Sequence, residues 1–466
     1  MPVVSLCAVS FLLASCGNTY YFAGRPLPPS GLKNRVMVAL ENPAASGSLA
    51  ILDAFYDVRN PQSNENGSFS ISGYAGSFPS TIQNMPEQEK GGVYSSGDGK
   101  FTLVDYSAEK GGSAIAGLPT QSTSVFISRN LLYAIAANQT SHIVAVVDQL
   151  VGRGFYLNVP GINRVSINAS GSVALAFTQD TDDVYSMVHL TVSQQSAAAA
   201  SSDPQHFNLA GQPAQDCEPQ TLPVYCAFKV TAAPGASFSR PIKAMFSADG
   251  ASAFILNCGP ECGGTQAGIT TIPITAASLN NGSAGPSGVS LVATSTTAVP
   301  GGVTNALQNG HTMYVTGQRV QTDGYLAGYL TILDTSSLPL KVTSGPIAIS
   351  DGAHVKMAFA DDSTLWIGSV LCHQGERSHH GDLSGCLTIF NTATNTVTLI
   401  PPYKGDATGI APIPDLHKVY TVEGGQVYIY NTPDGSQRDN SKVTSSDVAS
   451  DITYMDAASD GANTTY

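Results

Sequence analysis

The feature that most constrains the fold is a repeated unit of four short β-prone segments, clearest in residues 353–401. Apolar residues alternate with polar ones at Val355, Met357 and Phe359, and a second apolar segment begins at Leu365. A third segment ends at Asn391, and a fourth follows at residues 396–399. Short β-rich segments separated by turn residues are typical of antiparallel sheets, so this unit predicts one four-stranded blade of a β-propeller.

The third segment of each unit repeats along the chain and usually ends in Asp or Asn. A carboxylate or amide there can accept a hydrogen bond from the following backbone, an Asx-turn that starts the connection to the outer strand. Residues 184–191 and 268–275 occupy the same place without the Asp. The units recur every 40 to 60 residues or so, the period of propeller blades. The segment ends are Asp53, Asp105, Asp148, Asp334, Asn391 and Asn431.

The number of blades follows from counting first strands and asking how the ring closes. Residues 34–58 supply later strands without a first strand, whereas residues 451–456 supply a first strand with little after it. Pairing these two ends makes one more blade and removes an exposed sheet edge. We therefore expect an all-β fold, a single propeller over residues 34–466 with eight blades, or seven. The other first strands begin near Ser80, Thr123, Arg164, Pro241, Gly302, His354 and Ala407.

The first segments also share a pattern, an apolar strand that ends in a polar turn, as in residues 242–250 with Asp249-Gly250. Together the segments resemble the YVTN/YncE-like β-propeller repeat family, and the resemblance covers most of residues 34–466. The YVTN tetrapeptide itself is absent. A WD40 propeller is disfavoured, because Trp366 is the single tryptophan and no Trp-Asp dipeptide occurs. Some lactonases share this propeller family, but their catalytic residues match no positions here.

The N-terminus resembles a bacterial lipoprotein signal. Residues 3–14 form an apolar segment too short to span a bilayer and of the right length for a signal peptide. Small residues and then Cys16 follow, as in a lipobox, although no Lys or Arg precedes the segment. We expect residues 1–15 to be removed, Cys16 to be lipidated, and residues 16–33 to form a Pro/Gly tether. Gly17 after the Cys favours the outer membrane of the bacterial envelope.

Residues 191–240 interrupt the repeat with a segment rich in Ala, Ser, Gln and Pro. Two interpretations stay open for this insertion: an excursion from one blade that is partly disordered, or a cap over one face of the propeller.

The composition limits the classes of partner that the protein is expected to bind. Only 12% of the residues are charged and the net charge is −13, with no run of Lys or Arg. Nucleic-acid binding needs a concentrated basic surface, so no nucleic-acid partner is expected. Membrane contact is expected through the lipid anchor alone. The chain is expected to be a monomer without a cofactor.

Six cysteines remain after Cys16, and they fall into three local pairs. An even number in an exported chain favours disulfides over a metal site. The loop inside the last pair holds His373, His379 and His380, which are weak candidates for Zn²⁺ or Cu²⁺ ligands because their spacing fits no fixed geometry. The expected disulfides are Cys217–Cys226, Cys258–Cys262 and Cys372–Cys386.

Other chemical motifs are weak. Asp180, Asp182 and Asp183 alternate like part of a calcium loop, but an acidic hairpin turn is the simpler interpretation because the Gly and terminal Glu are missing. Catalytic fingerprints such as G-x-S-x-G or H-E-x-x-H do not occur.

Two functions remain open. The first is a non-enzymatic binding or scaffold protein of the envelope, with a protein, peptide or glycan ligand. The second is a lactonase-like hydrolase or quinoprotein-type redox subunit with its site at the propeller funnel. We favour binding, because the residues expected to face the funnel are neutral: Ser128, Asn168, Ser247 and Gln308. Neutral hydrogen-bonding groups suit recognition, whereas hydrolysis needs a poised acid or base.

Overall fold

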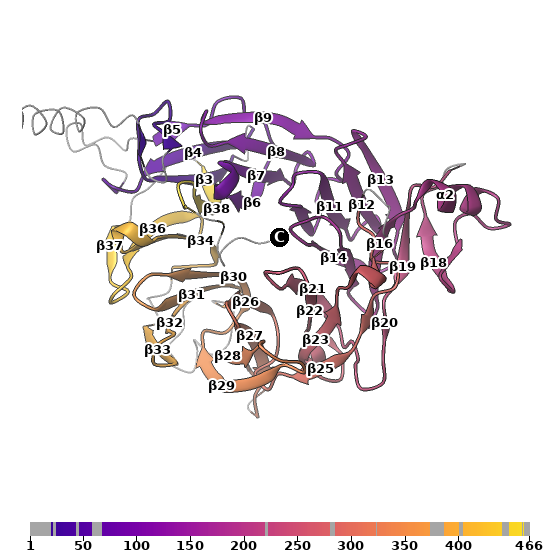
Figure 1. Cartoon of the computed structure of the whole chain (residues 1–466). Coiled ribbons are helices and arrows are strands. Elements are labelled where there is room, and N and C mark those ends of the chain that lie inside the picture. Colours follow the sequence, from indigo (N-terminus) through magenta and orange to yellow (C-terminus); the bar gives the residue numbers. More distant parts are fainter. Residues whose placement is uncertain are drawn as a thin grey trace, which may run out of the picture.

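The computed structural model is a ring of eight antiparallel blades around a central channel (Figure 1). It describes residues 20–21, 25–42, 46–57, 68–219, 222–279, 285–322, 324–372, 386–399, 404–439, 447–458 and 460. The predicted all-β propeller and the eighth blade made from both ends of the repeat region are confirmed.

Each blade contains four strands that run from the channel outward. Blade 1 is β38 (Val448–Tyr454), β3 (Arg35–Glu41), β4 (Ser48–Asp53) and β5 (Ser68–Ser70); blade 2 is β6 (Pro79–Met85), β7 (Lys90–Ser95), β8 (Lys100–Asp105) and β9 (Lys110–Ile115). Blade 3 is β10 (Ser124–Ile127), β11 (Tyr133–Asn138), β12 (Ile143–Asp148) and β13 (Arg153–Asn158); blade 4 is β14 (Ile162–Ile167), β15 (Ala174–Thr178), β16 (Val184–His189) and β19 (Tyr225–Lys229).

The second half of the ring repeats this order. Blade 5 is β21 (Pro241–Phe246), β22 (Ser252–Asn257), β23 (Gly268–Pro273) and β25 (Ser295–Ala298); blade 6 is β26 (Asn305–Asn309), β27 (Thr312–Val320), β28 (Leu326–Asp334) and β29 (Lys341–Ile349). Blade 7 is β30 (Ala353–Ala360), β31 (Thr364–Val370), β32 (Leu387–Asn391) and β33 (Thr396–Leu399); blade 8 is β34 (Ala407–Ile413), β35 (Lys418–Glu423), β36 (Gln426–Asn431) and β37 (Gln437–Asp439).

The hydrophobic core lies between blades, because alternate residues of one strand face opposite neighbours. In β3, Val36 and Val38 pack toward blade 8, whereas Met37 and Ala39 pack toward blade 2. The other blade junctions hold comparable clusters of buried apolar side chains. Both faces of the middle strands are therefore buried, which explains why these strands are almost continuously apolar in sequence.

The ring closes where β38 pairs with β3, with Val36 opposite Tyr454 and Val38 opposite Ile452. A buried ion network reinforces the closure. The Arg35 guanidinium donates to Asp456, with Nη2 to Oδ1 at 2.6 Å, and to Glu109 of blade 2, with Nη1 to Oε1 at 3.0 Å. The backbone N–H of Arg35 also donates to Asp456, at 2.7 Å.

The Asx-turns predicted after the third strands are present at five of the six positions; Asn431 forms none, and its amide donates to the Ser436 hydroxyl instead. The side-chain oxygen of the last residue accepts a backbone N–H two or three residues further on, at 2.8–3.0 Å. The turns follow Asp53, Asp105, Asp148, Asp334 and Asn391. Side-chain chemistry at one repeated position therefore ends one strand and begins the turn in blade after blade.

Residues 191–240 lie at the outer edge of blade 4, away from the channel (Figure 1). They contain the helix α2 (Val192–Ala199), the strands β17 (Asn208–Leu209) and β18 (Gln212–Cys217), and β19, which is the outer strand of the blade itself. Short strands β20 (Thr231–Ala232) and β24 (Val292–Ala293) pair beside it. The segment thus widens one sheet and does not cover the channel.

Disulfides join Cys217 to Cys226, Cys258 to Cys262 and Cys372 to Cys386. The first holds β18 against β19, and its two sulfurs are part of a small apolar cluster under α2. Within the described part of the chain, no helix has the length and apolarity that crossing a bilayer requires.

Candidate functional site

The inner strands that surround the channel share a local irregularity. In β6, β14, β21, β30, β34 and β38, one residue near the start of the strand is skipped in the pairing register, a β-bulge. A bulge changes the direction of the side chains that follow it. The residues directly after the six bulges are Thr81, Arg164, Lys243, Lys356, Gly409 and Asp451. Four of these six are charged, in a protein where only 12% of residues are.

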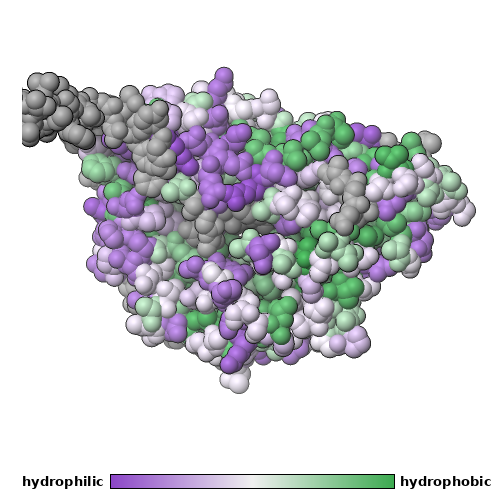
Figure 2. Space-filling view, viewed as in Figure 1, coloured by the Kyte–Doolittle hydropathy of each residue, from purple (hydrophilic) through white to green (hydrophobic). Residues whose placement is uncertain are grey.

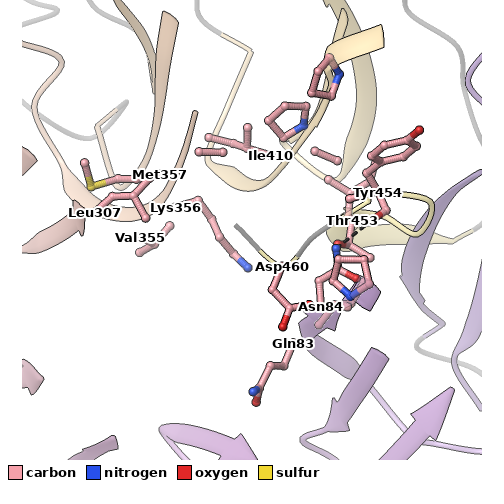
Figure 3. A pocket seen from close by; sticks show the side chains of 18 of the residues that line it. Gln83, Asn84, Leu307, Val355, Lys356, Met357, Ile410, Thr453, Tyr454 and Asp460 are labelled. Atoms are coloured by element: carbon pink, nitrogen blue, oxygen red, sulfur yellow. Dashed lines mark hydrogen bonds between the residues drawn. The ribbon is translucent and has the colours of Figure 1, made fainter. Parts of the chain in front are cut away.

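A cavity of about 400 Å³ occupies the channel beyond this level (Figure 3). Its wall comes from the inner strands of blades 1, 2, 5, 6, 7 and 8 and combines apolar and polar surface in equal shares, with Leu307, Val355 and Ile410 among the apolar lining residues. Lys243 and Lys356 lie in the same wall. The volume falls in the range of small-molecule binding sites, which combine apolar surface with a few placed polar groups.

Lys356 has an acidic partner. Its side chain extends from β30 across the cavity toward blades 1 and 2 (Figure 3), and its Nζ lies 2.7 Å from Asp451 Oδ2. The same carboxylate accepts the backbone N–H groups of Ile82, at 2.8 Å, and Ile452, at 2.9 Å. Asp451 is 1% exposed, so it is committed to holding blade 1 to blade 2 and to neutralising Lys356.

Lys243 has no acidic partner among the described residues. Its Nζ donates to the amide oxygen of Asn305, at 3.2 Å, which carries no charge. Burial, and after it the nearby positive charges of Arg164 and Lys356, lower the pKa of Lys243 to about 8. This amine is therefore partly deprotonated near neutral pH, unlike an ordinary lysine.

Arg164 is also without a partner, since it makes no hydrogen bond or ion pair with any described residue. Its side chain is accessible to solvent, yet burial lowers its pKa. This combination is expected for a group that projects into a narrow water-filled channel.

His354 lies beside this level but is neutral. Burial lowers its pKa to about 4. Its Nδ1 lies 2.9 Å from the Thr304 hydroxyl, and its Nε2 lies 2.9 Å from the carbonyl oxygen of Ser350. With Nε2–H donating to the carbonyl and Nδ1 accepting from Thr304, both ring nitrogens are satisfied without a charge. His354 is thus a structural bridge between blades 6 and 7.

Part of the cavity wall belongs to a group of charged side chains that pair with one another. The residues after β38 contribute Ala457, Ala458 and Asp460 to this wall. Asp460 accepts the backbone N–H of Glu87, at 3.0 Å, and pairs with Arg129 Nε, at 2.9 Å. Glu87 and Arg129 also pair directly. Figure 2 shows hydrophilic side chains gathered over blade 2 next to the centre of the ring.

The neutral residues predicted to face the funnel do not form its wall, and that prediction is wrong. Ser128, Asn168 and Ser247 follow their first strands and cap the next turn by accepting the N–H groups of Tyr133, Val173 and Ser252. Gln308 donates to the carbonyl of Gly310, at 2.8 Å. These side chains close hairpins, because short polar groups after a strand bond to their own backbone.

Neutral side chains of the inner strands also tie neighbouring blades together. Gln83 of blade 2 accepts from the Ile127 N–H and donates to its carbonyl, at 2.8 and 2.7 Å. Ser124 accepts from Val165 N–H and Ser166 accepts from Ala244 N–H. These neutral polar groups at the channel therefore have structural roles.

The predicted lipidation site Cys16 and the metal candidates His373, His379 and His380 lie outside the described residues. The acidic residues of the calcium-like segment are described. Asp182 accepts the Arg240 N–H at 2.8 Å, and Asp183 pairs with Lys229, so these two carboxylates turn to different partners.

One cluster was not foreseen. Asp361 and Asp362 of blade 7 both pair with His417 of blade 8, and these contacts raise the pKa of His417. The three groups could ligate a divalent cation only by giving up this pairing.

The sequence contained one signal for the channel cations. Arg164, Lys243 and Lys356 are each the single Lys or Arg of a first strand. A single cation at the same place in three first strands indicates a shared direction, which the pairing registers supply.

Comparisons with known proteins assign neither a family nor a function. No protein family matches the sequence, and no curated protein does. Among solved structures, hydrazine synthase of Kuenenia stuttgartiensis is 13% identical with a TM-score of 0.47, covering 77% of this chain and 96% of its own. AztD of Citrobacter koseri is 8% identical with a TM-score of 0.47, covering 90% and 98%. A protein described as a candidate 6-phosphogluconolactonase of Bacteroides uniformis is 11% identical with a TM-score of 0.46, covering 90% and 99%. At these identities and scores the similarity transfers no residue role, and the chain is described by its architecture, an eight-bladed β-propeller.

Proposed function

We propose that this propeller is a non-enzymatic binding protein that holds its ligand, or a protruding group of a peptide or glycan, in the cavity at the end of the channel. The observation that carries the proposal is the cavity itself, whose wall combines apolar side chains with polar groups on rigid strands. The rigid ring supports it, because interblade clusters and side-chain bridges fix the position of every lining strand.

The chemistry of the wall favours binding over hydrolysis. The described lining residues include no Ser, Cys or His. Acyl or lactone hydrolysis needs a nucleophile or activated water beside a poised acid or base. Lys243 is the one observation on the side of an enzyme, since its lowered pKa of about 8 would let the amine act as a base. A hydrolase would therefore depend on Lys243.

A cavity-filling variant tests the proposal. Val355 lines the cavity and is 38% exposed, so Val355→Trp should fill the site and leave the core intact. Val192→Trp, at a position 79% exposed on α2, is the matched control. A thermal-shift screen of small acids, sugars and peptides should find ligands that stabilise the wild type and the control but not Val355→Trp. Stabilisation that survives in Val355→Trp, or lactone turnover that disappears in Lys243→Met, would contradict it.

The proposal includes a cellular location. The lipobox-like Cys16 and the resemblance to YVTN/YncE-like propellers support a lipid-anchored protein of the bacterial envelope, with the outer membrane favoured. Cys16→Ala should move the protein from the membrane to the soluble fraction. Unchanged fractionation would contradict the anchor without bearing on the cavity.

A further inference from the structure

The charges along the channel are unevenly compensated. The level set by the bulges carries Arg164 on blade 4, Lys243 on blade 5 and Lys356 on blade 7, with Asn305 on blade 6 between the last two. Asp451 on blade 1 is paired with Lys356. One arc of the channel therefore holds two cations, Arg164 and Lys243, that no described carboxylate neutralises.

The fully buried cations of this protein are paired. Lys418 donates to the carbonyl of Ala54, at 2.8 Å, and to Asp57, at 2.5 Å. Arg35 is held between Asp456 and Glu109. Withdrawing a cation from bulk water is unfavourable unless it is paired. Lys243 is half-buried and Arg164 is accessible to solvent, yet neither has an acidic partner in the described part of a protein whose net charge is −13.

The cavity wall carries both charges and apolar groups. Lys243, Lys356, Asp415 and Asp460 all line it, and Lys356 and Asp460 are paired with Asp451 and Arg129. Lys243 is the lining cation without an acidic partner among the described residues, so an anionic group is favoured beside it. The same wall includes Leu307, Val355 and Ile410, which suit an apolar or neutral body.

We propose that the channel binds a small organic acid, with its carboxylate or phosphate head at Arg164 and Lys243 and its neutral body in the cavity. This inference rests on the proposed binding function and names the chemical class of its ligand. Arg can hold an oxyanion through two parallel N–H groups, and Lys adds a compact charge. The ligand would supply the negative charge that the channel lacks.

Matched probes test the head group. Phenylacetate and phenylacetamide have nearly the same shape and differ in charge, and phenyl phosphate replaces the carboxylate by a phosphate. Their dissociation constants are measured by saturation-transfer NMR with the full chain at pH 7 and constant ionic strength. We expect one or both anions to bind at least tenfold more tightly than the amide. The better anion identifies the head group.

Variants of the two cations locate the site. Lys243→Met and Arg164→Gln should each reduce the preference for the anion at least tenfold, whereas Lys341→Met, at an exposed position on β29, should leave it unchanged. Each channel variant without ligand should also melt at the wild-type temperature or above, because an unpaired charge has been removed. Loss of a purely structural cation would lower the melting temperature.

Three outcomes would overturn this inference, and they differ in what they imply for the proposed function. Equal binding of acid and amide that disappears in Val355→Trp would overturn the anion proposal and leave cavity binding intact. No binding of any probe, together with screening hits that Val355→Trp does not affect, would overturn both. A preference for the anion that survives in both Lys243→Met and Arg164→Gln would also overturn the anion proposal.

Discussion

Replacing Asp456 by Ala should destabilise the ring more than any surface change. Asp456 is fully buried and accepts hydrogen bonds from the backbone N–H, Nε and Nη2 of Arg35. Without it, the guanidinium still donates to Glu109 and to the carbonyl of Tyr106 but loses the carboxylate that accepts most of its hydrogen bonds. Removing one partner of a buried ion pair costs about 3–5 kcal/mol, because the remaining charge is left poorly compensated.

The measurement is urea unfolding, followed by the fluorescence of Trp366, which is fully buried between blades 7 and 8. Asp456→Ala should lower the free energy of unfolding by about 3–5 kcal/mol. Asp98→Ala is the control, since its pair with Lys100 is exposed and such pairs contribute about 0–1 kcal/mol. Equal stabilities of Asp456→Ala and Asp98→Ala would refute the argument that the closure depends on this network.

Three further predictions concern crosslinks and titration. Replacing Cys372 and Cys386 by Ala should cost about 3 kcal/mol, and replacing Cys258 and Cys262 should cost less, because the chain-entropy contribution grows with loop length and the separations are 14 and 4 residues; equal losses in urea unfolding would contradict this. Burial lowers the pKa of His354 from 6.5 to about 4, so the unfolded chain takes up this proton first as the pH falls. The free energy of unfolding should therefore decline between about pH 6.5 and 4, and His354→Gln should remove part of that decline. Lys243 loses its proton at a pKa of about 8, with Arg164 and Lys356 facing it, so anion affinity measured by NMR should fall as the pH rises from 7 to 9 in the wild type but not in Lys243→Met; a flat wild-type profile would exclude a charged Lys243 from the site.

The repeat predicted the architecture because the information for a blade is local. The β-prone segment at residues 353–360, the turn residues and the Asp or Asn after the third strand each act within a few residues, and the strand and the turn are found in the structure. Burial along β30 does not alternate as expected, since Val355 is exposed and Ala358 is buried. The closing blade could also be predicted, because strands without partners must pair to remove an exposed sheet edge.

The channel could not be predicted in the same way. Whether Lys243 points to the channel or into a blade junction depends on the bulge at Ile242, and a bulge is a property of the pairing between β21 and β22. The sequence shows residue types but not that register. For the same reason Ser128 and Asn168 were assigned to the funnel, although both fold back onto their own turns.

The pairing of β38 with β3 also sets the order of folding. The backbone N–H of Arg35 and the carboxylate of Asp456 are 421 residues apart, so blade 1 cannot be completed until nearly all of the other blades have been synthesised. Contacts of such long range form slowly, because bringing distant segments together has a large entropic cost. Until then β3 has an open inner edge that can pair with another chain. This interval is when a chaperone would be needed, and slowing the last step should increase aggregation more than it lowers the stability of the finished ring.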